Sequence, residues 1–263
     1  MAESFESDWL TLRAGADRAA RSATLALLLE RRLAEGAGDG PVTILDLGAG
    51  NGNNMRLLGA AMSLPQRWRL VDADEALLEE ARRHAPAHLA VETVVGDLAG
   101  DIDALLDPRA DAVTASALFD LCSAAWLDRF VEGLAARCLP LLGVLTYDGR
   151  QDWAGEMAED AAVLEAFHAD HHRDKGLGIA LGPQAHDHLA HALRAAGYRV
   201  QEADSAWCLS RPDDAALIEA LADGTSRAVA PALGPAAERW RLERRAATAV
   251  TIGHRDLLAT PPD

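Results

Sequence analysis

The sequence has few cysteines and little positive charge. Its three cysteines, Cys122, Cys138 and Cys208, are far apart and include no C-x-x-C pair, which argues against both a disulfide framework and a zinc site. No apolar run reaches membrane-spanning length, and the acidic N-terminus does not resemble a signal peptide. We therefore expect a cytoplasmic protein that keeps its thiols reduced.

Basic residues are outnumbered by acidic ones. The chain has 25 Lys and Arg against 41 Asp and Glu, a net charge of −16, and Lys175 is its only lysine. Because nucleic acids and anionic membranes repel an acidic surface, neither is expected as a partner. A small-molecule substrate, neutral or cationic, fits better, although the charge could serve solubility alone.

A glycine-rich turn stands between a predicted strand and a predicted helix. Val42–Leu47 is a short apolar run of the kind found in buried parallel strands. Gly48, Gly50 and Gly52 follow, and helical spacing then begins near Met55. A ligand can approach such a turn closely, and the helix N-terminus behind it favours an anion.

Asp46 decides which ligand this turn suits. The spacing is G-x-G-x-G, not the G-x-G-x-x-G of dinucleotide sites, and Asn53 stands where the third glycine would be. A nearby carboxylate gives nothing to a pyrophosphate but attracts an ammonium group. Asp46-Leu-Gly48-Ala-Gly50-Asn-Gly52 resembles the first motif of the class I S-adenosylmethionine-dependent methyltransferases.

Further acids follow the next two predicted strands, Arg67–Val71 and Val91–Val95. Asp72 lies at the tip of the first, about two dozen residues after Gly48, where an acid can accept hydrogen bonds from ribose hydroxyls. The resemblance implies that S-adenosyl-L-methionine is the cofactor. It assigns the ribose to Asp72, and the adenine to Asp97 and Leu98. The residues it assigns to the methionine part are Asp46, Gly48, Gly50 and Asn51.

The ends of the fourth and fifth predicted strands fall at the same ligand-binding edge. Ser116 ends the fourth, and Asp120 follows it, either to contact the cofactor or substrate or to cap the next helix. The fifth, over residues 139–146, leads into Tyr147 and Asp148. Tyr147 and Asp148 are candidate catalytic groups by position alone.

The N-terminal segment, residues 8–34, is predicted to be one long helix. Arg13, Asp17 and Arg21 are spaced four apart along it, which is typical of a solvated face with ion pairs. In related enzymes such helices often cover the cofactor. Residues 1–40 would then be a lid whose arginine, Arg21 in the first place, meets the cofactor's carboxylate.

Residues 149–181 are predicted to be an insertion over the mouth of the pocket. It carries His168, His171 and His172 close to Lys175. Three interpretations stay open: a solvated helix end, a substrate lid whose His168 or His171 is a general base, and a metal site with Asp174. The last is the least favoured because the spacing is not a usual zinc signature, so no metal is predicted.

Residues 182–263 complete the predicted sheet. A helix follows Pro183, and its histidines, His186, His188 and His191, are expected at the surface. A strand from Tyr198 to Ala203, or on to Leu209, comes next. Residues 210–247 are predicted to be a helical insertion whose arginines form a dimer contact, a substrate cap or, as we favour, a solvated face; a homodimer is left open. Residues 249–253 are the last strand.

Together these features predict an α/β fold. We expect a Rossmann-like, seven-stranded, mostly parallel sheet with helices on both faces and an antiparallel last strand, in which residues 41–148 form the cofactor-binding half. The expected function is transfer of a methyl group from S-adenosylmethionine to a small-molecule nucleophile. The alternatives are a nicotinamide-dependent oxidoreductase and a non-catalytic protein that binds S-adenosylmethionine.

Overall fold

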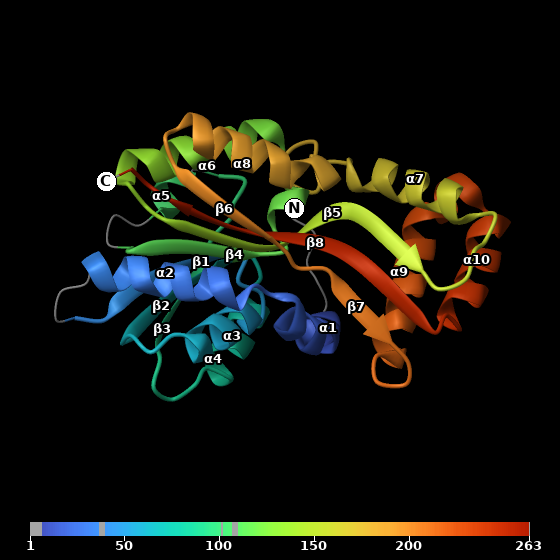
Figure 1. Ribbon diagram of the computed structural model, residues 1–263, viewed down its shortest axis with the longest axis horizontal. Helices are drawn as coiled ribbons and strands as arrows, with labels where there is room; N and C mark the ends of the chain where they lie inside the picture. The colour runs from blue at the N-terminus through green and yellow to red at the C-terminus, as the bar shows by residue number, and fades with distance from the viewer. Residues whose placement is uncertain (1–6, 37–39, 101, 107–109, 263) are drawn as a thin grey trace.

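An eight-stranded sheet runs the length of the molecule (Figure 1). The computed structural model describes residues 7–36, 40–100, 102–106 and 110–262, so parts of the segment 1–40 lie outside it. The strand order is β3-β2-β1-β4-β5-β8-β6, and β7 pairs with β8. The strands are β1 (Val42–Leu47), β2 (Gln66–Asp72), β3 (Ala90–Val95), β4 (Ala112–Ser116), β5 (Leu141–Trp153), β6 (Arg199–Asp204), β7 (Trp207–Ser210) and β8 (Ala249–Thr260).

The first five strands are parallel, and β8 is antiparallel to each of its neighbours β5, β6 and β7. This confirms the predicted Rossmann-like fold with an inserted antiparallel strand. The predicted number of seven strands was one too low. The segment after Tyr198 breaks into β6 and β7 because Asp204 turns the chain, accepting a hydrogen bond from the backbone N–H of Ala206 at 3.0 Å.

Helices cover both faces of the sheet (Figure 1). One apolar core lies between the sheet and α2, α3 and α4, and the other lies beneath α5, α6 and α8. No helix in the described ranges is both long and apolar enough to cross a membrane. The α-helices are α1 (Ser7–Ala20), α2 (Ala23–Gly36), α3 (Asn53–Ala61), α4 (Glu75–Arg83), α5 (Ile102–Leu105), α6 (Ala124–Arg137), α7 (Asp160–His171), α8 (Ala185–Ala195), α9 (Ala215–Leu233) and α10 (Pro235–Arg245).

The single N-terminal helix predicted over residues 8–34 is two helices, α1 and α2. The chain breaks at Arg21 and Ser22. The Ser22 backbone N–H donates to the Asp256 carboxylate at 2.8 Å, and the Ser22 hydroxyl accepts from the N–H of Leu25 at 3.3 Å. Because of these two contacts, the chain can change direction between α1 and α2 while the backbone N–H groups at the start of α2 keep hydrogen-bond partners.

The end of the molecule that carries α7, α9 and α10 is built around long extensions of β5 and β8 (Figure 1). β5 continues to Trp153, so the region after residue 149 begins as sheet and not as an insertion. A small apolar cluster, which includes Val163, Val229 and Trp240, joins the three helices. This end encloses space that the parallel sheet alone would leave open.

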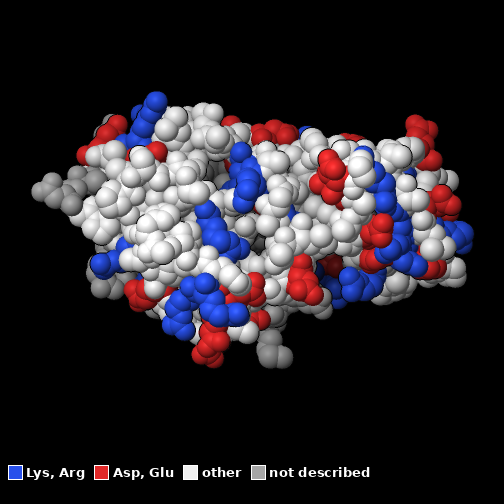
Figure 2. All heavy atoms as spheres, turned by 90° about the horizontal axis from the view of Figure 1, so that it is seen from below, with Lys and Arg blue, Asp and Glu red and all other residues white. Residues whose placement is uncertain are grey.

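Residues 210–247 were expected to present a solvated basic face, and this is wrong for some of these residues. Arg244 and Trp240 are only 3% and 1% exposed, because both bond to Asp160 on α7. Arg239, Arg241 and Arg245 pair with acids, and Figure 2 shows the two charges interspersed at this end. His186 was also misplaced: it is 1% exposed and lies 2.8 Å from Glu202.

Candidate functional site

The glycine turn has the conformation that the sequence predicted. Gly48, Gly50 and Gly52 have φ angles of 62°, 50° and 77°, which a residue with a side chain seldom adopts. At Gly52 a Cβ atom would also lie 2.8 Å from the Cβ of Ala81 on α4. The turn is therefore held close to its neighbours, and α3 begins directly after it.

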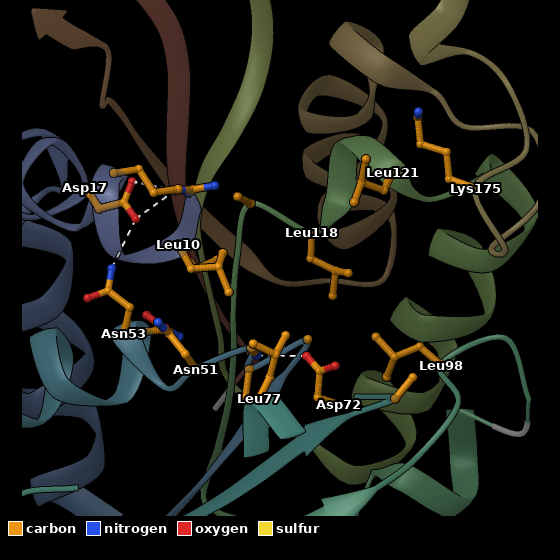
Figure 3. Close-up of a pocket in the computed structure, with 18 of the residues that line it drawn as sticks. Leu10, Asp17, Asn51, Asn53, Asp72, Leu77, Leu98, Leu118, Leu121 and Lys175 are labelled. Atoms are coloured by element: carbon orange, nitrogen blue, oxygen red, sulfur yellow. Dashed lines mark hydrogen bonds and ion pairs between the residues drawn. The ribbon is translucent and has the colours of Figure 1, made fainter. Parts of the chain in front are cut away.

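A cavity of about 150 Å³ lies against this turn (Figure 3). Its walls come from the ends of β1, β2, β3 and β4 and from α1. Seven of the ten residues predicted to bind the cofactor line it, namely Gly48, Gly50, Asn51, Asp72, Asp97, Leu98 and Ser116. Arg21, Asp46 and Asp120 do not line this cavity.

Asp72 joins the tip of β2 to the glycine turn. One carboxylate oxygen accepts a hydrogen bond from the backbone N–H of Gly50 at 2.8 Å, drawn as a dashed line in Figure 3. The other accepts from the N–H of Asp74 at 3.0 Å. Asp97 accepts from the N–H of Ala99 at 2.9 Å. Both carboxylates are thus oriented by backbone donors at the cavity wall.

Asp46 lies behind the turn in a buried polar group. Asn54 donates to its carboxylate at 2.6 Å and to the hydroxyl of Thr114 at 3.1 Å, while Arg21 donates to the Asn54 side-chain oxygen. Burial raises the pKa of Asp46 to about 7 and lowers the pKa of Arg21. These residues support the glycine turn from beneath. No pattern in the sequence indicated that Asn54 and Thr114 would bond to each other and that Asn54 would bond to Asp46.

Arg13, and not Arg21, is the arginine of the N-terminal helices that lines the cavity. Its Nε donates to both Asp17 oxygens, at 3.2 and 3.0 Å, and its guanidinium lies 5.1 Å from the ring centre of Trp207. Asn53 at the start of α3 also donates to Asp17, at 3.1 Å (Figure 3). Helix α1 is therefore fixed over the glycine turn, as a lid would be.

A second, larger cavity of about 850 Å³ adjoins the first. It lies among α1, α7, α9 and the far parts of β5, β7 and β8. Arg13, Ala117, Leu121 and Lys175 line both cavities, and we call these four residues the neck. Two of them follow β4, so the neck lies at the carboxyl edge of the parallel strands.

Asp120 and His171 come together at the wall of the larger cavity. His171 Nε2 is 3.1 Å from a carboxylate oxygen of Asp120, and both side chains are buried. The ring of Tyr147 stacks on His171 with centroids 5.5 Å apart, and its hydroxyl lies 3.1 Å from His168 Nε2. His171 and Tyr147 line this cavity, whereas His168 lies behind Tyr147.

The fold of this chain is similar to the folds of known proteins. Magnesium protoporphyrin IX methyltransferase of Synechocystis PCC 6803, solved with bound S-adenosylhomocysteine, is 12% identical with a TM-score of 0.52, over 100% of this chain and 90% of that one. A candidate methyltransferase of Bacillus halodurans C-125 is 15% identical with a TM-score of 0.52, and the match covers 89% of this chain and 99% of that one. Residues 44–140 match the model of a family described as a methyltransferase domain.

Residues 44–140 therefore carry a methyltransferase domain. This confirms the family that the glycine motif resembles. A search of curated protein sequences finds no match. The family match ends at residue 140, before Tyr147, α7 and α9, so the walls of the larger cavity are mostly outside it.

Two further predictions concern residues near this methyltransferase domain. Asp148 bonds to Arg150 at 2.6 Å and lines neither cavity. The residues of the least favoured metal hypothesis are not gathered around one point, because within the described ranges the one group of three metal-binding side chains is His186, Asp187 and Glu202. Arg255 already bonds to both of those carboxylates, which leaves that group poorly suited to a cation.

Proposed function

We propose that the protein is an S-adenosylmethionine-dependent methyltransferase that acts on a small molecule. The observation that carries the proposal is the neck, because its four residues line both the cavity at the glycine turn and a neighbouring cavity large enough for a small-molecule substrate. A methyl group held at the neck would face an acceptor in the larger cavity. Such alignment supplies most of the catalysis when the methyl donor already carries a good leaving group.

The chemistry of the smaller cavity fits the cofactor. The oriented carboxylates of Asp72 and Asp97 would accept hydrogen bonds from the ribose hydroxyls and the adenine amine, and Leu98 would flank the ring. The glycine turn, Asn51 and the N-terminus of α3 would hold the methionine part. Ser116 would complete the wall beside it.

Arg13 would bind the methionine carboxylate in place of Arg21. It lines the cavity, whereas Arg21 is buried beside Asn54. Asp46 would act indirectly, because Asn54, which donates a hydrogen bond to it, lines the smaller cavity. The lid hypothesis is thus kept, with a different arginine.

The acceptor's proton would go to the pair Asp120 and His171. Their contact at 3.1 Å orients the imidazole at the wall of the larger cavity, as a general base requires. Burial raises the pKa of Tyr147 far above neutrality, so Tyr147 stays protonated and is a wall residue. His168, whose pKa is lowered by burial, acts on Tyr147 and not on the acceptor.

Calorimetric titration with S-adenosylhomocysteine and, separately, with NADH tests the cofactor. We expect wild type to bind S-adenosylhomocysteine in the micromolar range and not to bind NADH. Asp72→Ala and Asp72→Asn should weaken this binding at least about tenfold, since each removes hydrogen bonds of a charged group. Asp128→Ala, at an exposed carboxylate on α6, is the control.

Three outcomes would reject parts of this proposal. Binding of NADH instead would mean a nicotinamide-dependent oxidoreductase. Binding of S-adenosylhomocysteine without any methyl transfer to a panel of small acceptors would mean a non-catalytic binding protein. Unchanged affinity in both Asp72 variants would place the cofactor elsewhere.

A further inference from the structure

Five aromatic rings form a continuous wall along the larger cavity. From Trp9 the wall runs to Trp207, His254, Tyr147 and His171, with successive ring centroids 6.3, 4.7, 6.2 and 5.5 Å apart. We call this row the aromatic wall. A planar, apolar molecule can stack along such a surface, because flat rings lose little conformational freedom there and gain offset or edge contacts.

Four residues that line this cavity each have a buried polar atom with no hydrogen-bond partner in the described part of the chain. These atoms are Asp120 Oδ1, His171 Nδ1, His254 Nδ1 and Trp207 Nε1. Buried polar groups without partners cost free energy, and four of them at one cavity indicate a ligand that supplies the missing partners. The ligand must therefore carry polar groups as well as a flat apolar body.

Two of these atoms, His171 Nδ1 and Asp120 Oδ1, can only accept a hydrogen bond. The Asp120 carboxylate accepts from His171, which places the proton on Nε2 and leaves a lone pair on Nδ1. Asp120 Oδ1 is an acceptor in any case. Burial lowers the pKa of His254 to about 4, so this ring is neutral near pH 7 and adds no charge to the aromatic wall.

The position of this pair decides which kind of donor fits. Asp120 directly precedes Leu121 of the neck, so the pair lies beside the place where the methyl group would arrive. The two cations of the neck, Arg13 and Lys175, are paired with Asp17 and Asp170, so they do not select the acceptor. A base beside the methyl position favours a hydroxyl acceptor, because a hydroxyl oxygen attacks well only as it loses its proton.

We infer that the substrate is a hydroxylated aromatic compound, methylated on the oxygen that faces Asp120 and His171. The inference rests on the proposed function. The hydroxyl gives its proton to the Asp120–His171 pair, and the oxygen's electron pair forms the new bond to the methyl carbon. The methyl–sulfur bond breaks, its electrons stay on sulfur to leave S-adenosylhomocysteine, and the proton passes to water.

The test uses 4-nitrophenol, whose absorption shows whether its hydroxyl is ionised. Protein saturated with S-adenosylhomocysteine is titrated with the probe at pH 6, where the free probe is mostly protonated. We expect the wild type to bind the probe in its ionised form. His171→Gln and Asp120→Asn should each lower the ionised bound fraction about tenfold, because each removes a charge-assisted contact.

The exposed pair His188 and Asp128 provides the matched control. Its atoms lie 2.8 Å apart on α8 and α6, so His188→Gln and Asp128→Asn make the same chemical changes away from both cavities and should leave ionisation unchanged. Affinity for S-adenosylhomocysteine, measured for every variant, shows that the fold is intact.

The outcomes separate this inference from the proposed function. If S-adenosylhomocysteine does not bind the wild type, the methyltransferase proposal fails and this inference fails with it. If it binds but the probe stays protonated, or if His171→Gln and Asp120→Asn ionise it as wild type does, only the inference is overturned. Faster methyl transfer to benzylamine than to phenols would overturn it as well.

Discussion

Arg244 on α10 is bonded to Asp160, the first residue of α7. The Arg244 Nε donates to Asp160 Oδ1 at 3.1 Å, and Trp240 donates to the same oxygen at 2.9 Å. Arg244 Nη1 donates to the carbonyl oxygens of Ala154 and Gly155, at 3.0 and 2.8 Å. Helix α7 carries His168 and His171, so this contact fixes the helix that closes one side of the larger cavity.

Arg244→Ala should therefore lower the free energy of unfolding by about 2–3 kcal/mol. The substitution leaves Asp160 and two carbonyl oxygens without this partner, and breaking an ion pair whose arginine is buried is costly. Urea denaturation measures the change. Arg239→Ala removes a mostly exposed arginine of the same helix, 3.5 Å from Glu159, and should cost less than about 1 kcal/mol. Equal losses in the two variants would show that the Arg244 contact does not stabilise the fold.

Arg13 and Arg21 should differ in what their removal affects. Arg13→Ala is expected to weaken binding of S-adenosylhomocysteine about tenfold, because the cofactor's carboxylate loses a charged donor. Calorimetry measures this affinity, and Arg18→Ala on the exposed side of α1 is the control.

Arg21→Ala should instead destabilise the fold by about 3 kcal/mol. The guanidinium lies buried among the carboxyl groups of Asp256, Asp46 and Asp17, and the ionised acids would lose their compensating cation. Denaturant unfolding of Arg21→Ala and Arg13→Ala compares the two. A larger loss of affinity in a stable Arg21 variant would restore Arg21 as the carboxylate ligand.

Asp46 should make stability fall as pH rises from about 4 to 7. Its pKa is about 7 in the folded protein, against 3.8 for an unperturbed carboxyl. Between these values the folded state holds a proton that the unfolded state has lost, so stability decreases with pH. Asp46→Asn removes this contribution. The free energy of unfolding of both proteins is measured at several pH values. As pH rises from about 4 to 7, the wild type should lose a few kcal/mol of stability relative to Asp46→Asn. A difference independent of pH would contradict the raised pKa.

Gly52→Ala should both destabilise the protein and impair cofactor binding. The position has φ of 77°, and the new Cβ would lie 2.8 Å from Ala81 Cβ. We expect a loss of about 2 kcal/mol from backbone strain and crowding. Gly15→Ala on α1, where no atom of the described residues other than nearby backbone of the same helix lies within 4 Å of the new Cβ, should be stabilising by about 0.5–1 kcal/mol. Thermal melting and titration with S-adenosylhomocysteine measure both effects, and a Gly52→Ala protein with wild-type behaviour would show that the turn tolerates a side chain.

For most of the predicted cofactor residues, local sequence patterns were sufficient to predict a place at the wall of the smaller cavity. The strand before Gly48, the acids at Asp72 and Asp97 and the helix after the turn are each determined within a few residues, because strand burial, glycine φ angles and helix starts are short-range effects. Parallel strands bring their carboxyl ends to one edge. This is why seven of the ten predicted cofactor residues line one cavity.

The tertiary structure alone decided the rest. Asp120 and His171 are 51 residues apart in the sequence, and no periodicity relates them. Whether Arg13 or Arg21 faces the cavity depends on the break at Ser22, which Asp256 stabilises from more than 200 residues away. The burial of Arg244 likewise depends on Asp160 of another helix. The sequence thus determined the sheet and its glycine turn through local rules, whereas packing between distant segments decided the larger cavity and the charges within it.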